Sequence, residues 1–258
     1  MLLAIDIGNT NIKIGVFDKK QLVRSWKMTS SEKRTSDEIV AQFKQIFNVA
    51  DLDIGYIDSA IMSSVIPQLN YSMQKAIEYC FKVKVNVVNV KMDCGLTVCY
   101  DNPEELGTDR ILDCVAALES YGSPFILVDY GTATTYNCVN EKGVFVGGCI
   151  CTGIKQKMLA LSNATARLPE VELINVQKAI ETSTIRGLQS GMLLSTIGET
   201  VYITNRMKEE MGLENVKVIA TGGFSNLVAK NENLFDIIDK ELSLKGLCVI
   251  YERIKNQL

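Results

Sequence analysis

The sequence LLAIDIGNTNIKIGVF occupies residues 2–17. Residues 2–5 form a short apolar run that ends at Asp6, as expected of a buried β-strand. Residues 8–10, Gly-Asn-Thr, follow as a tight turn. From Asn11 onward polar and apolar residues alternate, as expected of a second strand with one buried face. The stretch therefore predicts a β-hairpin that places Asp6 at the end of its first strand, beside the turn.

The turn of this hairpin has the composition of a phosphate-binding loop. Gly8 permits a positive φ and close backbone approach, and the Thr10 hydroxyl and the Lys13 ammonium are donors suited to phosphate oxygens. A carboxylate such as Asp6 is a suitable ligand for a hydrated Mg²⁺ that bridges phosphates. An ordinary Asn-Gly hairpin with a capping aspartate has the same residues, so this D-x-G-x-T pattern leaves both interpretations open.

A second copy of the pattern begins in the middle of the chain. Residues 124–128, PFILV, are another apolar run, and Asp129 opens the sequence DYGTATT. Asp129 follows Asp6 by 123 residues, almost half of the 258-residue chain, which indicates a duplicated domain. The pattern resembles the superfamily of actin, the sugar kinases and Hsp70. This resemblance implies an α/β fold with two duplicated actin-like (ribonuclease H-like) lobes, residues 1–118 and 119–258, and a nucleotide cleft between them.

The composition excludes several classes of chemistry. The chain contains no histidine, which rules out a Ser-His-Asp triad, a Cys/His zinc site and a histidine base. Acid–base chemistry must therefore come from Asp, Glu, Lys, Tyr or Cys. The eight cysteines include no C-x-x-C pair, as in proteins of reducing compartments.

Charge and hydropathy narrow the location and the partners. No apolar stretch approaches the roughly 18 residues of a transmembrane helix, and the N-terminus lacks the basic region of a signal peptide. The net charge is −3, and without a basic block it argues against nucleic acid as the main partner. These features predict a cytoplasmic protein with no membrane and no nucleic-acid partner.

Local patterns predict the order β-β-β-α-β-α-β for the first half, as in an actin-like lobe; an unrelated α/β sheet is the alternative. Thr35 and Glu38 have the spacing of a capping box before a helical stripe of apolar residues. Further strands are expected at residues 21–28, 57–65, 84–90, 133–138, 144–150 and 216–220, and further helices at residues 68–81, 153–163 and 187–211.

A polar segment between the two halves, residues 100–110, reads YDNPEELGTDR. Apolar residues at helical spacing follow it, so Asp109 and Arg110 are expected in the first turn of a helix with Thr108 near its N-cap. A helix N-terminus favours an ionised aspartate and attracts anions. The Arg110 guanidinium is a fork for a carboxylate or a phosphate. A capping aspartate beside a surface arginine is the alternative.

Five motifs together resemble one family. The chain is similar to the type III pantothenate kinases in D-x-G-N-T at residues 6–10, Y-x-N-P at 100–103, G-x-D-R at 107–110, D-x-G-T-A-T at 129–134 and T-G-G at 221–223. The resemblance implies ATP-dependent phosphorylation of pantothenate to 4'-phosphopantothenate, the first step of coenzyme A biosynthesis. It also implies a homodimer that uses Mg²⁺ and a monovalent cation, K⁺ or NH₄⁺.

The same resemblance implies roles for individual residues. Asp109 would be the base that deprotonates the primary hydroxyl of pantothenate, Asp129 would bind the monovalent cation, and Asp6 would hold Mg²⁺ through the phosphates. Thr184 would reach pantothenate across the dimer interface. The implied ATP-binding residues are Asp6, Ile7, Gly8, Asn9, Thr10, Asn11, Ile12, Lys13 and Thr132. The implied pantothenate-binding residues are Tyr100, Gly107, Thr108, Asp109, Arg110 and Thr184.

Three segments depart from the family pattern. The family usually has G-x-N-T where this chain has ETST at residues 181–184, so Thr184 aligns but the loop before it differs, and a helix N-cap is the alternative role of Thr184. Residues 151–153, Cys-Thr-Gly, replace the usual P-G. Phe224 stands in place of a small or acidic residue, and it either stacks on the nucleotide or belongs to the core.

Other functions stay open on the sequence alone. One alternative is a kinase of the same fold for another small hydroxylated metabolite, such as a sugar. A neutral sugar, however, has no carboxylate with which Arg110 could pair. A non-catalytic accessory regulator of the same fold does not need the intact Asp6, Asp109 and Asp129. An actin-like assembly protein needs polymer contacts that we do not identify in the sequence.

Overall fold

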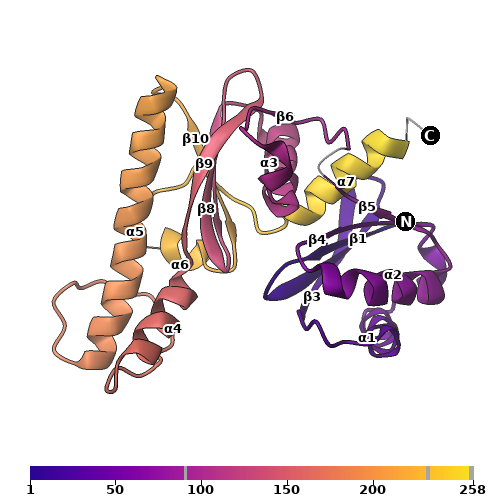
Figure 1. Cartoon of the computed structure of the whole chain (residues 1–258), viewed down its shortest axis with the longest axis horizontal. Helices are drawn as coiled ribbons and strands as arrows, with labels where there is room; N and C mark the ends of the chain where they lie inside the picture. Colours follow the sequence, from indigo (N-terminus) through magenta and orange to yellow (C-terminus); the bar gives the residue numbers. More distant parts are fainter. Residues whose placement is uncertain (90–91, 231–232, 256–258) are drawn as a thin grey trace. The chain divides into compact units, whose positions relative to one another are not determined.

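The computed structural model describes residues 1–89, 92–230 and 233–255 (Figure 1). The chain divides into two compact units. Unit 1 comprises residues 1–96, 101–119 and 242–258, and unit 2 comprises residues 97–100 and 120–241. Compared with the expected ranges 1–118 and 119–258, the C-terminal segment from Leu242 falls in unit 1 rather than in the second unit. Residues 97–100 fall in unit 2.

Unit 1 contains a five-stranded mixed sheet of order β3-β2-β1-β4-β5. The central strand β1 is antiparallel to β2 and parallel to β4. The strands are β1 (Leu2–Ile7), β2 (Asn11–Asp18), β3 (Gln21–Thr29), β4 (Ser59–Ser64) and β5 (Val85–Val87). The helices are α1 (Ser36–Val49), α2 (Pro67–Phe81), α3 (Thr108–Tyr121) and α7 (Leu242–Lys255), with short 3₁₀ turns η1 (Ile54–Tyr56) and η2 (Pro103–Glu105).

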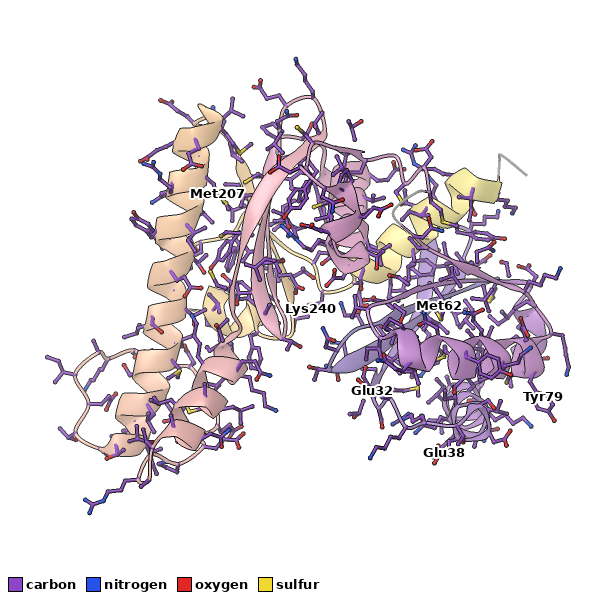
Figure 2. All side chains as sticks on the ribbon, viewed as in Figure 1. Glu32, Glu38, Met62, Tyr79, Met207 and Lys240 are labelled. Atoms are coloured by element: carbon purple, nitrogen blue, oxygen red, sulfur yellow. The ribbon has the colours of Figure 1, made fainter. Side chains whose placement is uncertain are left out.

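Helices α1 and α2 cover one face of this sheet. Alternate residues of β1, among them Ile5 and Ile7, join Phe43 of α1 and Met73 of α2 in one buried cluster. Met62 of β4 is fully buried in the same cluster, whereas Tyr79 lies exposed on the outer side of α2 (Figure 2). The intervening β1 residues, including Asp6, therefore point to the opposite face, where α7 contacts β1, β2 and β4.

The predicted start of α1 is confirmed. The Thr35 Oγ1 atom accepts a hydrogen bond from the Glu38 backbone N–H at 3.3 Å, and the Glu38 carboxylate accepts one from the Thr35 N–H at 2.8 Å. This reciprocal pair satisfies two backbone donors that a helix leaves without partners, and such a cap typically contributes about 1 kcal/mol.

Unit 2 contains a six-stranded mixed sheet of order β11-β10-β7-β8-β9-β6. Its core contains Val128 and Tyr130 of β7 packed with Leu193 and Ile197 of α5. The strands are β6 (Thr97–Val98), β7 (Phe125–Tyr130), β8 (Ala133–Val139), β9 (Val144–Thr152), β10 (Lys217–Gly222) and β11 (Ile237–Ile238). The helices are α4 (Ile154–Ala164), α5 (Thr184–Met211) and α6 (Ser225–Ala229).

The two sheets repeat one arrangement. In unit 2, β7 is antiparallel to β8 and parallel to β10, as β1 is to β2 and β4 in unit 1. Asp6 is the penultimate residue of β1, and Asp129 is the penultimate residue of β7. The two D-x-G-x-T motifs thus occupy the same position in two similar sheets, as a duplication predicts.

Most expected elements are present with small shifts in their bounds. The helix expected at residues 187–211 begins three residues earlier, at Thr184. The strand expected at residues 84–90 is β5 (Val85–Val87), and Val90 lies outside the described residues. The short strands β6 and β11 and the helices α6 and α7 were not predicted. Within the described ranges, no helix combines the length and apolarity required to cross a bilayer.

Candidate active site

Three polar side chains lie in a row at one end of the unit 1 sheet. Lys13 of β2 and Ser63 of β4 are the direct register partners of Asp6, so all three side chains point to the same face. Asp6 is only 7% exposed and Ser63 is fully buried. The row thus places a carboxylate between an ammonium and a hydroxyl in a largely dry environment.

Two helix N-termini complete this polar cluster. Ser243, the second residue of α7, accepts a hydrogen bond from Lys13 Nζ at 3.0 Å and donates one to the Asp6 carboxylate. On the other side, the Ser63 hydroxyl donates to Thr108 Oγ1 at 2.8 Å. Thr108 is the first residue of α3. Both helices therefore begin at the end of β1 where the D-x-G-N-T loop starts.

The environment of Asp6 disfavours its negative charge. Burial raises the pKa of Asp6, and the nearby Asp109 carboxylate raises it further, although Lys13 and the hydrogen bond from Ser243 act in the opposite direction. Burial is the largest of these effects. A divalent cation at this carboxylate would compensate the charge that the protein leaves poorly solvated.

The D-x-G-N-T loop is closed by backbone hydrogen bonds. The Gly8 N–H donates to the Asn11 carbonyl at 3.0 Å. Gly8 does not adopt the positive φ considered for it; a Cβ there would instead lie 3.1 Å from the Asn11 oxygen. Residues 9–11 are exposed. Ile7 and Ile12 are fully buried, so their side chains are not available to a nucleotide.

Asp109 and Arg110 lie in the first turn of α3, as predicted. The Asp109 Oδ1 atom accepts a hydrogen bond from the Arg110 N–H at 2.9 Å. A Cβ at Gly107 would lie 2.4 Å from the same oxygen, so any other residue at this position of the G-x-D-R motif would force the Asp109 carboxylate to move. Arg110 is 7% exposed. The alternative of a surface arginine is therefore wrong.

In unit 2 glycines surround the Asp129 carboxylate. A Cβ at Gly222 would lie 2.4 Å from Asp129 Oδ1, and one at Gly131 would lie 3.3 Å from Oδ2. Gly222 also has φ +90°, which L side chains rarely adopt. Similarly, a Cβ at Gly153 would lie 2.3 Å from the Thr132 carbonyl oxygen. The glycines of three separate motifs thus allow the backbone to lie close to the second D-x-G-T loop.

The remaining predicted residues of unit 2 lie apart from this loop in sequence. Tyr100 is half-buried, with its ring centroid 6.0 Å from that of Phe145. Thr184 is the exposed first residue of α5, and Ser183 is the N-cap, so the alternative role of Thr184 as N-cap is wrong. Phe224 packs against the unit 2 core, which favours the core interpretation over nucleotide stacking.

The sequence did not identify Ser63 and Ser243 as members of the site. Ser63 lies within the strand expected at residues 57–65, and its buried position beside Asp6 follows from the parallel pairing of β1 with β4. Ser243 precedes apolar residues at helical spacing, a signal for a helix N-terminus. Its contact with Lys13 joins residues 230 positions apart, which no local pattern reveals.

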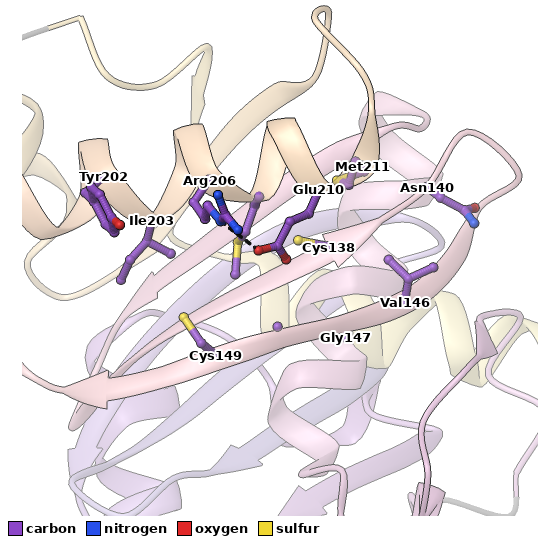
Figure 3. A pocket seen from close by; sticks show the side chains of 12 residues that line it. Cys138, Asn140, Val146, Gly147, Cys149, Tyr202, Ile203, Arg206, Glu210 and Met211 are labelled. Atoms are coloured by element: carbon purple, nitrogen blue, oxygen red, sulfur yellow. Dashed lines mark hydrogen bonds and ion pairs between the residues drawn. The ribbon is translucent and has the colours of Figure 1, made fainter.

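A separate cavity of about 650 Å³ lies in unit 2 between α5 and the β8–β9 hairpin (Figure 3). Arg206 and Glu210, which form an ion pair within α5, lie at its edge with Tyr202 and Met207. None of the predicted site residues lines it. This cavity therefore does not coincide with either D-x-G-x-T loop.

Residues 2–206 match the family model described as type III pantothenate kinase. The chain belongs to the type III pantothenate kinase family. These enzymes phosphorylate pantothenate in coenzyme A biosynthesis, and the protein is accordingly a kinase that uses ATP. The match includes both D-x-G-x-T loops and the G-x-D-R motif but ends before α7.

Solved structures confirm the fold over the full length. A Campylobacter jejuni protein, whose name assigns it to the Baf family of transcriptional activators, is 22% identical with a TM-score of 0.58, over 98% of this chain and 99% of its own. Component A of the Acidaminococcus fermentans (R)-2-hydroxyglutaryl-CoA dehydratase is 12% identical with a TM-score of 0.55, over 100% of this chain and 99% of its own. The ROK hexokinase of Thermus thermophilus is 12% identical with a TM-score of 0.52, over 99% of each chain. The predicted actin-like α/β fold of two lobes is thus confirmed.

Proposed function

We propose that this pantothenate kinase uses Asp109 as the base that accepts the proton of the pantothenate hydroxyl, while residues 6–13, from the end of β1 into β2, bind ATP phosphates and Mg²⁺. The observation that carries this proposal is the polar cluster of unit 1. It holds two carboxylates, Asp6 and Asp109, near each other and beside an exposed Gly-Asn-Thr loop. Phosphoryl transfer needs positioned phosphates, charge compensation and a carboxylate near the acceptor hydroxyl, and little else from the protein.

The Asp6 carboxylate fits a magnesium site of the usual kind. Mg²⁺ in kinases is commonly held by one or two carboxylates together with substrate phosphates and water. In the described ranges no group of three or more acidic or thiol side chains is placed to hold a metal, so the phosphates would complete the coordination. Bound Mg²⁺ supplies charge neutralisation for the transferred phosphoryl group.

We assign the monovalent cation, K⁺ or NH₄⁺, to Asp129 and an ATP contact to Thr132. The absence of side chains at Gly131 and Gly222, whose backbones lie close to the Asp129 carboxylate, supports this assignment, because it leaves the carboxylate oxygens uncrowded by a Cβ. Alanine at either position would place a methyl group against the carboxylate oxygens.

For pantothenate we assign Tyr100, Gly107, Thr108, Arg110 and Thr184 to binding. The Arg110 guanidinium pairs with the pantothenate carboxylate, which does not react, and thereby orients the hydroxyl at the other end of the molecule. The burial of Arg110 supports this role, since an ion pair is stronger where water is excluded.

A homodimer is supported by the exposed face of α5. Between Gly187 and Tyr202 the exposed positions of this helix carry no charged residue; they are Gly187, Gly191, Ser195, Gly198 and Tyr202. A surface helix normally carries charged residues on its solvent side, whereas glycines that face open space permit close approach of another helix. We also propose a cytoplasmic location, which the eight free thiols support.

The experiment is ADP release by the purified protein with ATP, Mg²⁺ and pantothenate, run in parallel in K⁺ and Na⁺ buffers. We expect release that requires pantothenate and is faster in K⁺. ADP release that does not depend on pantothenate would contradict the assignment of pantothenate as the acceptor. Equal rates in both buffers would contradict the assignment of a monovalent cation to Asp129. A sugar panel run beside pantothenate distinguishes another acceptor from an inactive protein.

A further inference from the structure

We propose that Ser243 is a positioning residue for Mg²⁺–ATP: its hydroxyl links the Asp6 carboxylate to the Lys13 ammonium and fixes both at the end of β1. This inference rests on the proposed function in one respect, the assignment of phosphates and Mg²⁺ to that end of the sheet. It adds a residue that lies beyond the part of the chain matched by the family model.

The geometry of Ser243 suits a bridge between opposite charges. The hydroxyl accepts a hydrogen bond from Lys13 Nζ at 3.0 Å and donates one to Asp6. A serine hydroxyl has one hydrogen to donate and two lone pairs to accept, so both bonds form at once. Ser243 is 2% exposed, and water is therefore poorly placed to substitute for it.

The bridge spans a cross-strand pair. Asp6 and Lys13 are direct register partners in β1 and β2, and Ser243 reaches both from a third element, α7. Hydrogen bonds to charged groups are typically about twice as strong as bonds between neutral groups. Ser243 therefore restricts the two side chains more than strand pairing alone does.

Close packing of α7 keeps the Ser243 hydroxyl in place. A Cβ at Gly246 would lie 2.1 Å from the Leu112 carbonyl oxygen of α3, and a Cβ at Gly15 would lie 3.1 Å from a methyl carbon of Leu244. The two glycines let α7 approach both α3 and β2 closely. A site residue whose backbone is fixed by packing is preorganised for its role.

Truncation of Ser243 should act on nucleotide and metal, and not on pantothenate. For Ser243→Ala we expect the KM for Mg²⁺–ATP and the Mg²⁺ concentration for half-maximal rate to rise roughly 10-fold, since a lost hydrogen bond to a charged group typically has this effect. We expect the KM for pantothenate to change less than about 2-fold. Ser243→Thr, which keeps the hydroxyl, should restore both ATP and Mg²⁺ constants to within about 3-fold of wild type.

A matched control lies on the same helix. Cys248 is buried and donates a long hydrogen bond to the Lys19 carbonyl at 3.5 Å, away from Asp6. Cys248→Ala removes a larger atom from α7 than Ser243→Ala does, and it should leave the ATP and Mg²⁺ constants at their wild-type values. Thermal unfolding of each variant reports whether it is folded, and Ser243→Cys, nearly equal in size, replaces the alanine variant if that variant does not fold.

The results separate the inference from the proposed function. Unchanged ATP and Mg²⁺ constants in Ser243→Ala would overturn the inference. Equal increases of these constants in Ser243→Ala and Cys248→Ala would also overturn it, because they would show that the packing of α7, and not the Ser243 hydroxyl, causes the effect. If the wild type releases no ADP with pantothenate, the proposed function fails first. Calorimetric titration of the same variants with Mg²⁺–ATP then decides on Ser243 independently, and equal affinities would refute it.

Discussion

At the scale of single residues, Asp6 combines a buried position with an ionisable group. Burial raises its pKa in the folded protein above the ordinary value of 3.8. The folded state therefore holds the proton more tightly than the unfolded chain does. It follows that Asp6 lowers the free energy of unfolding increasingly as the pH rises from 3.8 to the folded-state pKa, and by a constant amount above it.

Asp6→Asn removes the buried negative charge, and with it the loss of stability at higher pH, while it keeps the shape of the side chain. We expect the ligand-free variant to have a higher Tm than wild type at pH 7.5 and a smaller advantage at pH 4.5. Mg²⁺–ATP should raise the Tm of wild type more than that of the variant. Scanning calorimetry measures both effects.

The control for this experiment is Asp58→Asn. Asp58 is an exposed carboxylate whose pKa is lowered, chiefly by a hydrogen bond from the N-terminal amine. Its replacement should not raise the Tm at pH 7.5. A Tm of Asp6→Asn below that of wild type at pH 7.5 would contradict the assigned effect of burial.

Asp109 offers a test of the chemical step. Asparagine at this position retains an Oδ1 acceptor for the Arg110 N–H but cannot accept the proton from pantothenate. We expect Asp109→Asn to lower kcat by roughly 10²-fold or more without weakening nucleotide binding. Steady-state kinetics gives the rate, and the ATP-induced shift in Tm checks binding. Turnover close to wild type would remove Asp109 from the mechanism.

At the scale of elements, α7 and α3 cross at a glycine. A Cβ at Gly246 would overlap the backbone of Leu112, with the nearest contact at 2.1 Å. Alanine is the better helix former by about 1 kcal/mol, yet overpacking against backbone typically costs about 1–3 kcal/mol or more. We therefore expect Gly246→Ala to lower the free energy of unfolding, measured by urea denaturation, by a net amount of roughly 1–2 kcal/mol.

Gly187→Ala is the comparison for this substitution. Gly187 lies in the first turn of α5, and no atom lies within 4 Å of the position that a Cβ would take. Within one protomer nothing overlaps the added methyl group, so in protein kept monomeric only the helix preference acts, and stability should be unchanged or up to about 1 kcal/mol higher. Equal effects at positions 187 and 246 would show that the contact with Leu112 relaxes freely.

Local patterns predicted the elements that local interactions determine. The Thr35–Glu38 capping box predicted the start of α1, and the duplicated D-x-G-x-T motif predicted two sheets with equivalent central strands. Helix α7 was not predicted, because Gly246 is unfavourable inside a helix. The need for glycine at this position becomes clear only in the folded structure, where Leu112 of α3 lies opposite.

The candidate site was predicted only in part, because some of its residues are recognisable from local motifs and others are brought together only by tertiary packing. Asp6, Lys13 and Asp109 belong to short motifs, so sequence order identified them. Ser63 and Ser243 are ordinary serines, and they contribute through strand register and through a hydrogen bond that closes a loop of 230 residues. Pairing of this kind depends on tertiary packing, which residue type and spacing do not encode.

At the scale of the whole molecule, the uncharged face of α5 predicts self-association. Gly198→Arg places a long charged side chain on this face, and we expect it to convert a dimer into a folded monomer. Analytical ultracentrifugation measures the mass, and circular dichroism checks the fold. The control Tyr71→Arg alters a side chain on α2 that is 73% exposed and should remain dimeric. A wild type that is monomeric at micromolar concentration would contradict the proposal.

The return of the chain to unit 1 has a consequence for biosynthesis. A ribosome makes β1 well before α7, so the side of the first sheet that carries Ala4 and Asp6 has no α7 to cover it until the whole of unit 2 has been translated. Any product that terminates before Leu242 lacks the Ser243 hydroxyl and exposes an apolar sheet surface, a feature that cellular quality control recognises. We therefore expect a chain that stops before Leu242 to be a target for chaperones, and the contacts of Ser243 with Asp6 and Lys13 can form only after unit 2 has been synthesised.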